Sequence, residues 1–342
     1  MKPRSGYLFV ILFAAALALA ACGGDAGPAG PAGPAGPAGP AGAVGAAGAD
    51  GSDAALDVAD LSCTDCHNET SGILSVQARF AESHHATGDS WVRGSIGSCA
   101  GCHGSEGPKA RITAGLGPND ESIQGVATSS PINCRTCHDV HMTYTGADWA
   151  LTGDSAAVSF DRSDGTYDKG TANLCAECHQ IRHPRPEATD GMIEFTTTRF
   201  GPHHGVESNM AVGEGGMGVE GSAAGHYTLI EGGCVSCHMG ENANHGFEAQ
   251  LSSCEGCHAD IESFDLNGTQ TEIQALVDQI KPLLIASGIM NEENRSIPGT
   301  YTEEVVNAMW NYMYVIEDRS LGVHNPAFTR ALLNYSLEAL GG

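Results

Sequence analysis

Apolar side chains recur at helical spacing in the last quarter of the chain. One such stripe predicts a helix that Pro282 is expected to kink, and consists of Ile273, Leu276, Val277, Ile280 and Leu284. A second stripe predicts a helix over about 303–319, which Thr302 can cap, and consists of Val306, Met309, Trp310, Met313 and Ile316. Asn325 and Pro326 offer an N-cap and first-turn proline for a third helix that reaches Leu340. We therefore expect residues 266–342 to form a C-terminal helical segment.

The region before it, residues 54–265, has few long periodic stretches and is expected to be rich in loops. The whole chain has 46 glycines, and only 6% of its residues are aromatic. Glycine raises the conformational entropy that folding must remove, while bulky side chains that offset this cost are scarce. We therefore expect something other than side chains to fill the interior of residues 54–265.

The first residues have the pattern of an export signal. Lys2 and Arg4 precede an apolar run over 7–21, which is short for a membrane span. The run ends in Leu19-Ala20-Ala21-Cys22, which resembles the lipobox of bacterial lipoproteins. That resemblance implies removal of 1–21, acylation of Cys22 and, because Gly23 follows, an outer-membrane lipoprotein facing the periplasm or the cell surface. The alternative is an ordinary signal peptide with a stray cysteine.

A three-residue repeat follows, with glycine at every third position from Gly24 to Gly51. This spacing is what a collagen triple helix requires at its axis, and would make the protein a homotrimer. The same residues could instead form a semi-extended single-chain stalk. In both cases residues 22–53 are expected to hold the rest of the chain away from the membrane.

Charge narrows the range of partners. The chain has 16 basic and 41 acidic residues and a formal net charge of −25. Such a field repels nucleic acid and anionic lipid, and favours cationic partners or metal ions. We therefore expect no nucleic-acid partner.

Cysteine usage carries the chemistry. Of 13 cysteines, all but Cys22 form Cys-x-x-Cys pairs, and each pair is followed directly by histidine. The six motifs are Cys63/Cys66/His67, Cys99/Cys102/His103, Cys134/Cys137/His138, Cys175/Cys178/His179, Cys234/Cys237/His238 and Cys254/Cys257/His258. Two thiols at this spacing can bond to the two vinyl groups of a porphyrin, and the next residue then presents its imidazole to the iron. Zinc binding and thiol chemistry are the alternatives for a single pair, but six complete motifs predict six covalently attached c-type haems.

Nine histidines outside the motifs are candidates for the second axial ligand of each iron. Adjacent residues seldom reach the same metal, so the pairs His84-His85 and His203-His204 are expected to supply one ligand each. The preferred set is His85, His141, His204, His226, His245 and His324, with His183 ranked seventh. Ligation by two histidines predicts low-potential haems.

Residues 199–340 resemble the C-terminal half of the pentahaem cytochrome c nitrite reductases and their multihaem relatives. The matching elements are Gly225-His226 before the motif of Cys234, His245 before the motif of Cys254, a long helix, and the turn over 322–326. The resemblance implies that His226, His245 and His324 are haem ligands. The active haem of that family is held by a motif ending in lysine, and none of the six motifs here does so. The resemblance therefore implies a shared haem scaffold, from which nitrite chemistry does not follow.

Together these features predict a haem-packed fold of irregular loops and short α-helices, with little β structure and a C-terminal helical segment. The lipidated, stalked, hexahaem layout is similar to the outer-surface cytochromes of metal-reducing bacteria. The expected function is electron transfer to partner cytochromes or to extracellular iron or manganese. One alternative is a reductase of nitrite, hydroxylamine or a sulfur oxyanion with one open haem. Another is a subunit of a cytochrome oligomer or filament, joined through docked haems or the C-terminal helices.

Overall fold

The structure, a computed structural model, describes residues 71–342 except 154 and 241. These residues belong to one compact unit, Leu56–Gly342. The expected signal peptide, Cys22, the glycine-repeat stalk and the first motif (Cys63, Cys66 and His67) lie outside the described residues. No helix within 71–342 combines the length and the apolar character needed to cross a bilayer.

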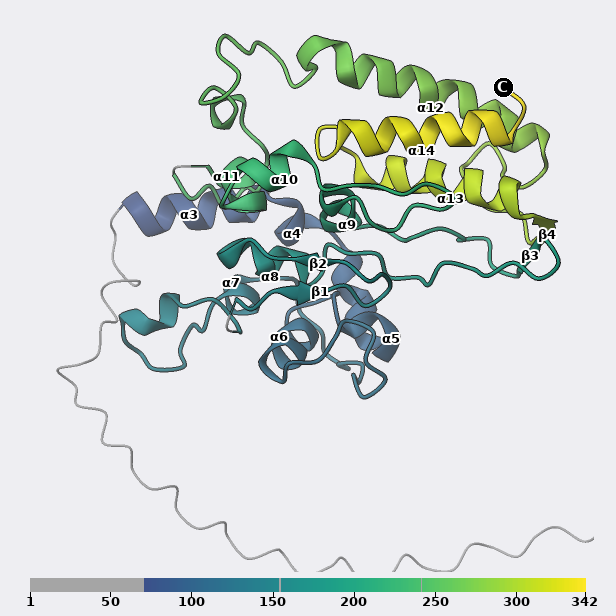
Figure 1. Ribbon diagram of the computed structural model, residues 1–342. Coiled ribbons are helices and arrows are strands. Elements are labelled where there is room, and N and C mark those ends of the chain that lie inside the picture. The colour runs from purple at the N-terminus through teal and green to yellow at the C-terminus, as the bar shows by residue number, and fades with distance from the viewer. Residues whose placement is uncertain (1–70, 154, 241) are drawn as a thin grey trace, which may run out of the picture. The chain divides into compact units, whose positions relative to one another are not determined.

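The part of the chain that holds the haem motifs consists of short helical turns joined by loops (Figure 1). Its α-helices are α3 (Ser71–Glu82), α4 (His84–Thr87), α5 (Gly97–Ala100), α6 (Glu106–Thr113), α7 (Cys134–Cys137), α8 (Asn173–Ala176), α9 (Glu207–Val212), α10 (Gly225–Leu229) and α11 (Gly233–His238). Several of these turns carry motif cysteines, so the local backbone already brings the two thiols of a motif to one side. At α7, for example, Asn133 and Thr136 form a reciprocal capping box around the first cysteine.

Strands are few and short within the described residues. β1 (Val158–Ser159) pairs with β2 (Thr166–Tyr167), and β3 (Met192–Phe195) pairs with β4 (Gly299–Thr302), both antiparallel. The prediction of a loop-rich, helical fold with little β structure is confirmed.

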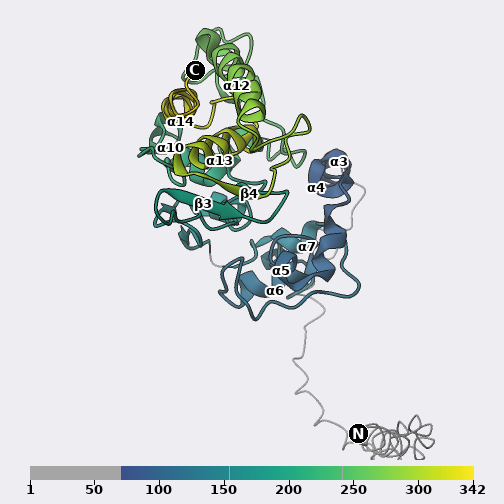
Figure 2. The ribbon, with the colours of Figure 1, turned by 90° about the vertical axis from the view of Figure 1, so that its right-hand side faces the viewer.

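Three longer helices form the C-terminal segment, namely α12 (Thr269–Ala286), α13 (Glu303–Asp318) and α14 (Pro326–Ala339). Figure 2 shows them packed against one another, with β3 and β4 beside α13. Pro282 lies inside α12 without ending it. Asn325 caps α14 by accepting a hydrogen bond from the backbone N–H of Phe328 at 3.2 Å, as the Asn-Pro pair predicts.

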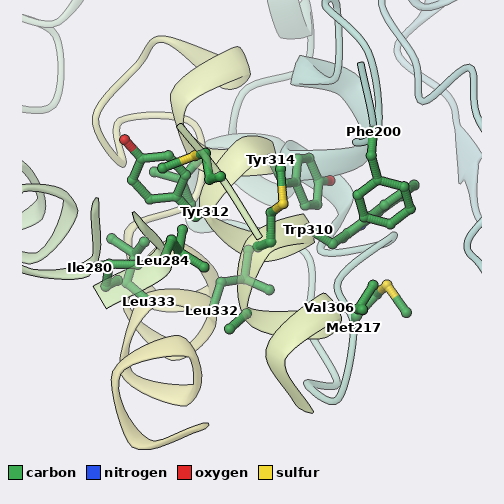
Figure 3. Packing of buried hydrophobic residues seen from close by; sticks show 14 of the residues in the cluster. Phe200, Met217, Ile280, Leu284, Val306, Trp310, Tyr312, Tyr314, Leu332 and Leu333 are labelled. Carbon is green, nitrogen blue, oxygen red and sulfur yellow. The ribbon is translucent and has the colours of Figure 1, made fainter. Parts of the chain in front are cut away.

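The main hydrophobic core lies between these helices and residues 181–217 (Figure 3). Trp310 is fully buried there, and its indole N–H donates to the carbonyl of Gly215 at 2.9 Å. Leu332 and Leu333 of α14 are also fully buried. The apolar stripes of the sequence therefore form this core.

The earlier part of the chain has almost no such core. Among residues 73–153, Ala100 is the one fully buried hydrophobic residue, whereas buried polar side chains include Ser105, Thr136 and Asp148. Side chains alone do not fill this region, as its composition predicts. The motifs of Cys99 and Cys134 lie within it.

Candidate haem sites

All ten motif cysteines among the described residues are free thiols. None of the Cys-x-x-Cys pairs in this part of the chain is closed into a disulfide. Both thiols of each described motif are therefore available for thioether bonds to a porphyrin.

The cysteines of the described motifs differ in their exposure to solvent. Cys257 is exposed, as is Cys134, whereas the other described motif cysteines are partly buried. The exposure of Cys257 has a local cause. Cys257 lies in a surface loop that follows the 3-10 turn η6 (Leu251–Ser253), and the two residues before it, Glu255 and Gly256, are exposed as well. The backbone N–H of Cys257 still donates to the carbonyl of Cys254, at 3.1 Å, so the motif keeps its turn. The last motif therefore lies at the surface, and the attachment of Cys257 to haem stays a prediction.

Each described motif histidine faces a second imidazole from elsewhere in the chain. The distances between ring centroids are 6.2 Å for His103–His203, 6.3 Å for His138–His245, 6.1 Å for His179–His85, 6.3 Å for His238–His324 and 6.1 Å for His258–His226. Metal–imidazole bonds are about 2 Å long, so one metal atom bound by two facing imidazoles separates their centroids by roughly 6 Å. The spacing of all five pairs matches a shared metal atom between the rings.

Hydrogen bonds fix the orientation of several of these rings through Nδ1. His138 donates to the carbonyl of Trp149 at 2.9 Å, and His238 donates to the carbonyl of Phe247 at 2.8 Å. Among the imidazoles that face motif histidines, His226 donates to the carbonyl of Val323 at 2.8 Å and His245 to that of Ala243 at 2.7 Å. A carbonyl only accepts, so the proton lies on Nδ1 and the lone pair of Nε2 is left for a metal.

Two further imidazoles are oriented by carboxylates. Nδ1 of His179 lies 2.9 Å from Oε2 of Glu207, and Nδ1 of His324 lies 2.7 Å from Oδ1 of Asp318. The Glu207 charge raises the pKa of His179 to about 9. Burial opposes protonation of His324, but Asp318 raises the pKa of that ring to about 9 as well.

Of the histidine pair 203–204, the structure places His203 opposite a motif histidine. His204 was the expected ligand, but its Nδ1 bonds the carboxylate of Glu317. The backbone at His203 has φ of 77°, in the left-handed region, and this conformation goes with the ring facing His103. His183, ranked seventh, stacks on His203 at 5.5 Å and donates from Nδ1 to the carbonyl of Gly201.

His141 stacks on Tyr144 with ring centroids 5.4 Å apart. Its backbone N–H donates to Oδ2 of Asp148 at 2.8 Å, and Thr143 N–H donates to Oδ1 of the same carboxylate at 2.7 Å. The buried Asp148 thus fixes the loop that carries His141. None of the five described motif histidines faces His141, because each is paired with another imidazole. The sixth motif histidine, His67, lies outside the described residues.

The motifs also contact one another. The Cys102 thiol lies close to that of Cys178, and the Cys175 thiol lies close to that of Cys234. Buried Arg111 joins two of these motifs, because it donates to the carbonyl of Gly101 and to the side chain of Glu177, at 2.5 and 2.6 Å. The motif of Cys175 therefore lies between the motifs of Cys99 and Cys234.

Comparison with solved structures gives the fold. The outer cell wall cytochrome OcwA aligns with 77% of this chain and 49% of its own, with a TM-score of 0.50 and 18% sequence identity. The chain has the fold of the multihaem cytochromes. It spans about half the length of OcwA. An undecahaem cytochrome from the S-layer of Carboxydothermus ferrireducens aligns with 78% of this chain and 40% of its own, with a TM-score of 0.45 and 20% identity. No protein-family model and no curated protein matches the sequence.

Within this multihaem cytochrome fold the residues present fit haem on three independent counts. The thiols are free, the imidazoles face each other at the separation of a shared metal atom, and residues 73–153 lack an apolar core of their own. Haem would occupy the space between facing imidazoles and supply the missing apolar bulk.

Four residues with a role at these sites could not be singled out from the sequence. Glu207 and Asp318 orient imidazoles, and Arg111 links two motifs. Phe247 contacts two imidazoles, with its ring centroid 4.9 Å from that of His85 and 5.8 Å from that of His245. The available signals were weak, namely an aromatic residue two positions after His245 in a chain with few aromatics, and an acidic residue six positions before His324.

Proposed function

We propose that this chain is a hexahaem c-type cytochrome that transfers electrons at the outer envelope of its cell. The observation that carries the proposal is the set of five facing imidazole pairs, one at each described motif. Bound haem supplies reversible one-electron chemistry of iron, and the chain contributes attachment, axial ligands and local charge.

The proposed distal ligands for the five described motifs are His203, His245, His85, His324 and His226, in the order of the motifs along the chain. We assign His141 to the first motif, that of Cys63, Cys66 and His67. It was one of the expected ligands, and the loop that carries it is held by Asp148. Compared with the set expected from the sequence, His203 replaces His204.

This ligand set favours an electron carrier over a reductase. An iron with two histidine ligands has no open position for nitrite, hydroxylamine or a sulfur oxyanion. Ligation by two histidines also gives a lower potential than a histidine and a methionine. Low-potential haems suit electron delivery to oxidised iron or manganese minerals, or to a partner cytochrome.

The contacts between motifs support a continuous path for electrons. The Cys175 motif lies close to the motifs of Cys99 and Cys234, with cysteine thiols near one another in both cases. The exposed Cys257 would hold the last haem with one edge open to solvent, where electrons can be exchanged with a partner. The lipobox-like sequence at Cys22 and the glycine repeat after it would place this path outside the outer membrane, on an anchored stalk or a trimeric one.

Electron paramagnetic resonance of the fully oxidised, full-length protein tests the proposal. We expect six low-spin haems and no high-spin signal, and no nitrite turnover with reduced viologen at the rate of a dedicated reductase. A stoichiometric high-spin haem together with such turnover would replace the proposal with the reductase alternative.

A further inference from the structure

The imidazoles of the described sites differ in the group that accepts the Nδ1 proton. At four of them, His138, His226, His238 and His245, the acceptor is a neutral backbone carbonyl. At His179 and His324 it is a carboxylate, from Glu207 and Asp318 respectively. The side chain of Asp318 is 1% exposed and that of Glu207 is 24% exposed, so water screens these charges poorly.

The two carboxylates act on neighbouring sites. His179 belongs to the motif of Cys175, and His324 faces His238 of the motif that begins at Cys234. The thiols of Cys175 and Cys234 lie close together, so the two motifs are neighbours. Glu207 also lies near enough to His324 for the two groups to interact electrostatically, which lowers the pKa of Glu207. The negative charge is therefore concentrated on one adjacent pair of sites.

A carboxylate in this position changes an iron–imidazole bond in two ways. By drawing the Nδ1 proton toward itself, it makes the imidazole more basic and a stronger donor to the metal. Its charge also stabilises the more positive ferric state by direct electrostatic attraction, which is strong where water is excluded. Both effects lower the reduction potential of the iron.

Positive charge, by contrast, lies near the site of the Cys99 motif. Arg93 and Arg182 lie near His103, and Arg182 also lies near His203. Positive charge there favours the ferrous state. Arg111 lies 3.6 Å from the Cys178 thiol, but its guanidinium is paired with Glu177 at 2.6 Å, which offsets its charge at the central sites.

We propose that Glu207 and Asp318 are positioning residues that make the haems of the Cys175 and Cys234 motifs the lowest in potential among the described sites. This inference rests on the proposed function, since it requires haem iron between the facing imidazoles. Electrons would rest on the arginine-flanked site of Cys99 and cross the central pair only in transit.

The test uses the full-length haem protein and the variants Glu207→Gln and Asp318→Asn. Each amide can still accept the Nδ1 proton through its oxygen, but the charge is gone. In spectroelectrochemical titrations we expect each variant to raise one of the lowest midpoint potentials. The oxidised-to-reduced ratio of that haem should change at least tenfold at fixed potential, which corresponds to 59 mV for one electron.

Two further variants separate charge from structure. Glu317→Gln is the matched control, because this carboxylate is adjacent to Asp318 on α13 but bonds His204, which faces no motif histidine among the described residues. It should leave the two lowest midpoint potentials within the tenfold limit. Glu207→Asp keeps the charge and should retain the low potential, even where Glu207→Gln fails to fold.

The outcomes distinguish this inference from the proposed function. Potentials that do not change in Glu207→Gln and Asp318→Asn, with every haem low-spin, would overturn the role of the carboxylates and leave the function standing. Parent protein that lacks haem, or holds it high-spin at these motifs, would overturn the function itself.

Discussion

At the scale of single residues, two adjacent histidines differ in what they face. His203 lies 6.2 Å from His103 between ring centroids, whereas His204 bonds Glu317. Sequence reasoning could establish that one of the two would face a motif, because neighbours rarely reach the same metal. It could not choose between them, because the choice depends on a left-handed backbone at a residue other than glycine, which is uncommon.

Replacing each histidine of this pair tests the assignment. We expect His203→Ala to convert one low-spin haem to a high-spin or water-ligated form, visible in electron paramagnetic resonance and in the optical spectrum. His204→Ala is the matched control and should leave every haem low-spin, because the His204 ring bonds Glu317 and packs on His203 but faces no motif histidine among the described residues. The reverse pattern would return the ligand to His204.

At the scale of elements, the C-terminal helices follow from the sequence and the short helical turns do not. The predicted helix over 303–319 is observed as Glu303–Asp318, and the one expected to begin at Pro326 ends at Ala339. Their apolar stripes pack against each other, so periodicity suffices to locate them. Turns such as α7 and α8 have four residues each, too few for periodicity to be visible.

The packing of these helices gives a stability prediction. Leu333 of α14 is fully buried, and Leu333→Ala should lower the free energy of unfolding by about 2–5 kcal/mol through lost burial and a residual cavity. Urea unfolding followed by circular dichroism measures this change. Leu229→Ala is the control, since Leu229 is 83% exposed and its loss should cost less than about 0.5 kcal/mol. Equal effects of the two variants would contradict the core described here.

At the scale of the whole molecule, the number of motifs can be read from the sequence, but which motifs are neighbours in space cannot. The motifs of Cys99 and Cys175 are 76 residues apart in the sequence and yet lie close together, with the thiol of Cys102 near that of Cys178. Such contacts depend on long-range folding, which motif spacing does not encode. The pairing of each motif with a distal histidine has the same origin, as with His238 and His324, which come from different elements.

Anchoring is a second whole-molecule prediction. Cys22 is the one cysteine outside the six motifs and ends a lipobox-like sequence. In the native host, Cys22→Ser should abolish acylation and release the protein from the membrane fraction, while its haem content stays unchanged. Metabolic labelling with a radioactive fatty acid, followed by fractionation, measures both effects. A variant that remains acylated and membrane-bound would contradict the lipoprotein assignment.

The central claim is that every motif carries a covalent haem, and the mass of the intact, matured chain tests it most directly. Twelve cysteines in six motifs predict six haem additions that persist after denaturation, since thioether bonds survive unfolding. A measured mass equal to the processed chain plus six haems is the expected result. A mass with fewer haems, or with zinc or disulfides in place of haem at any motif, would contradict the account.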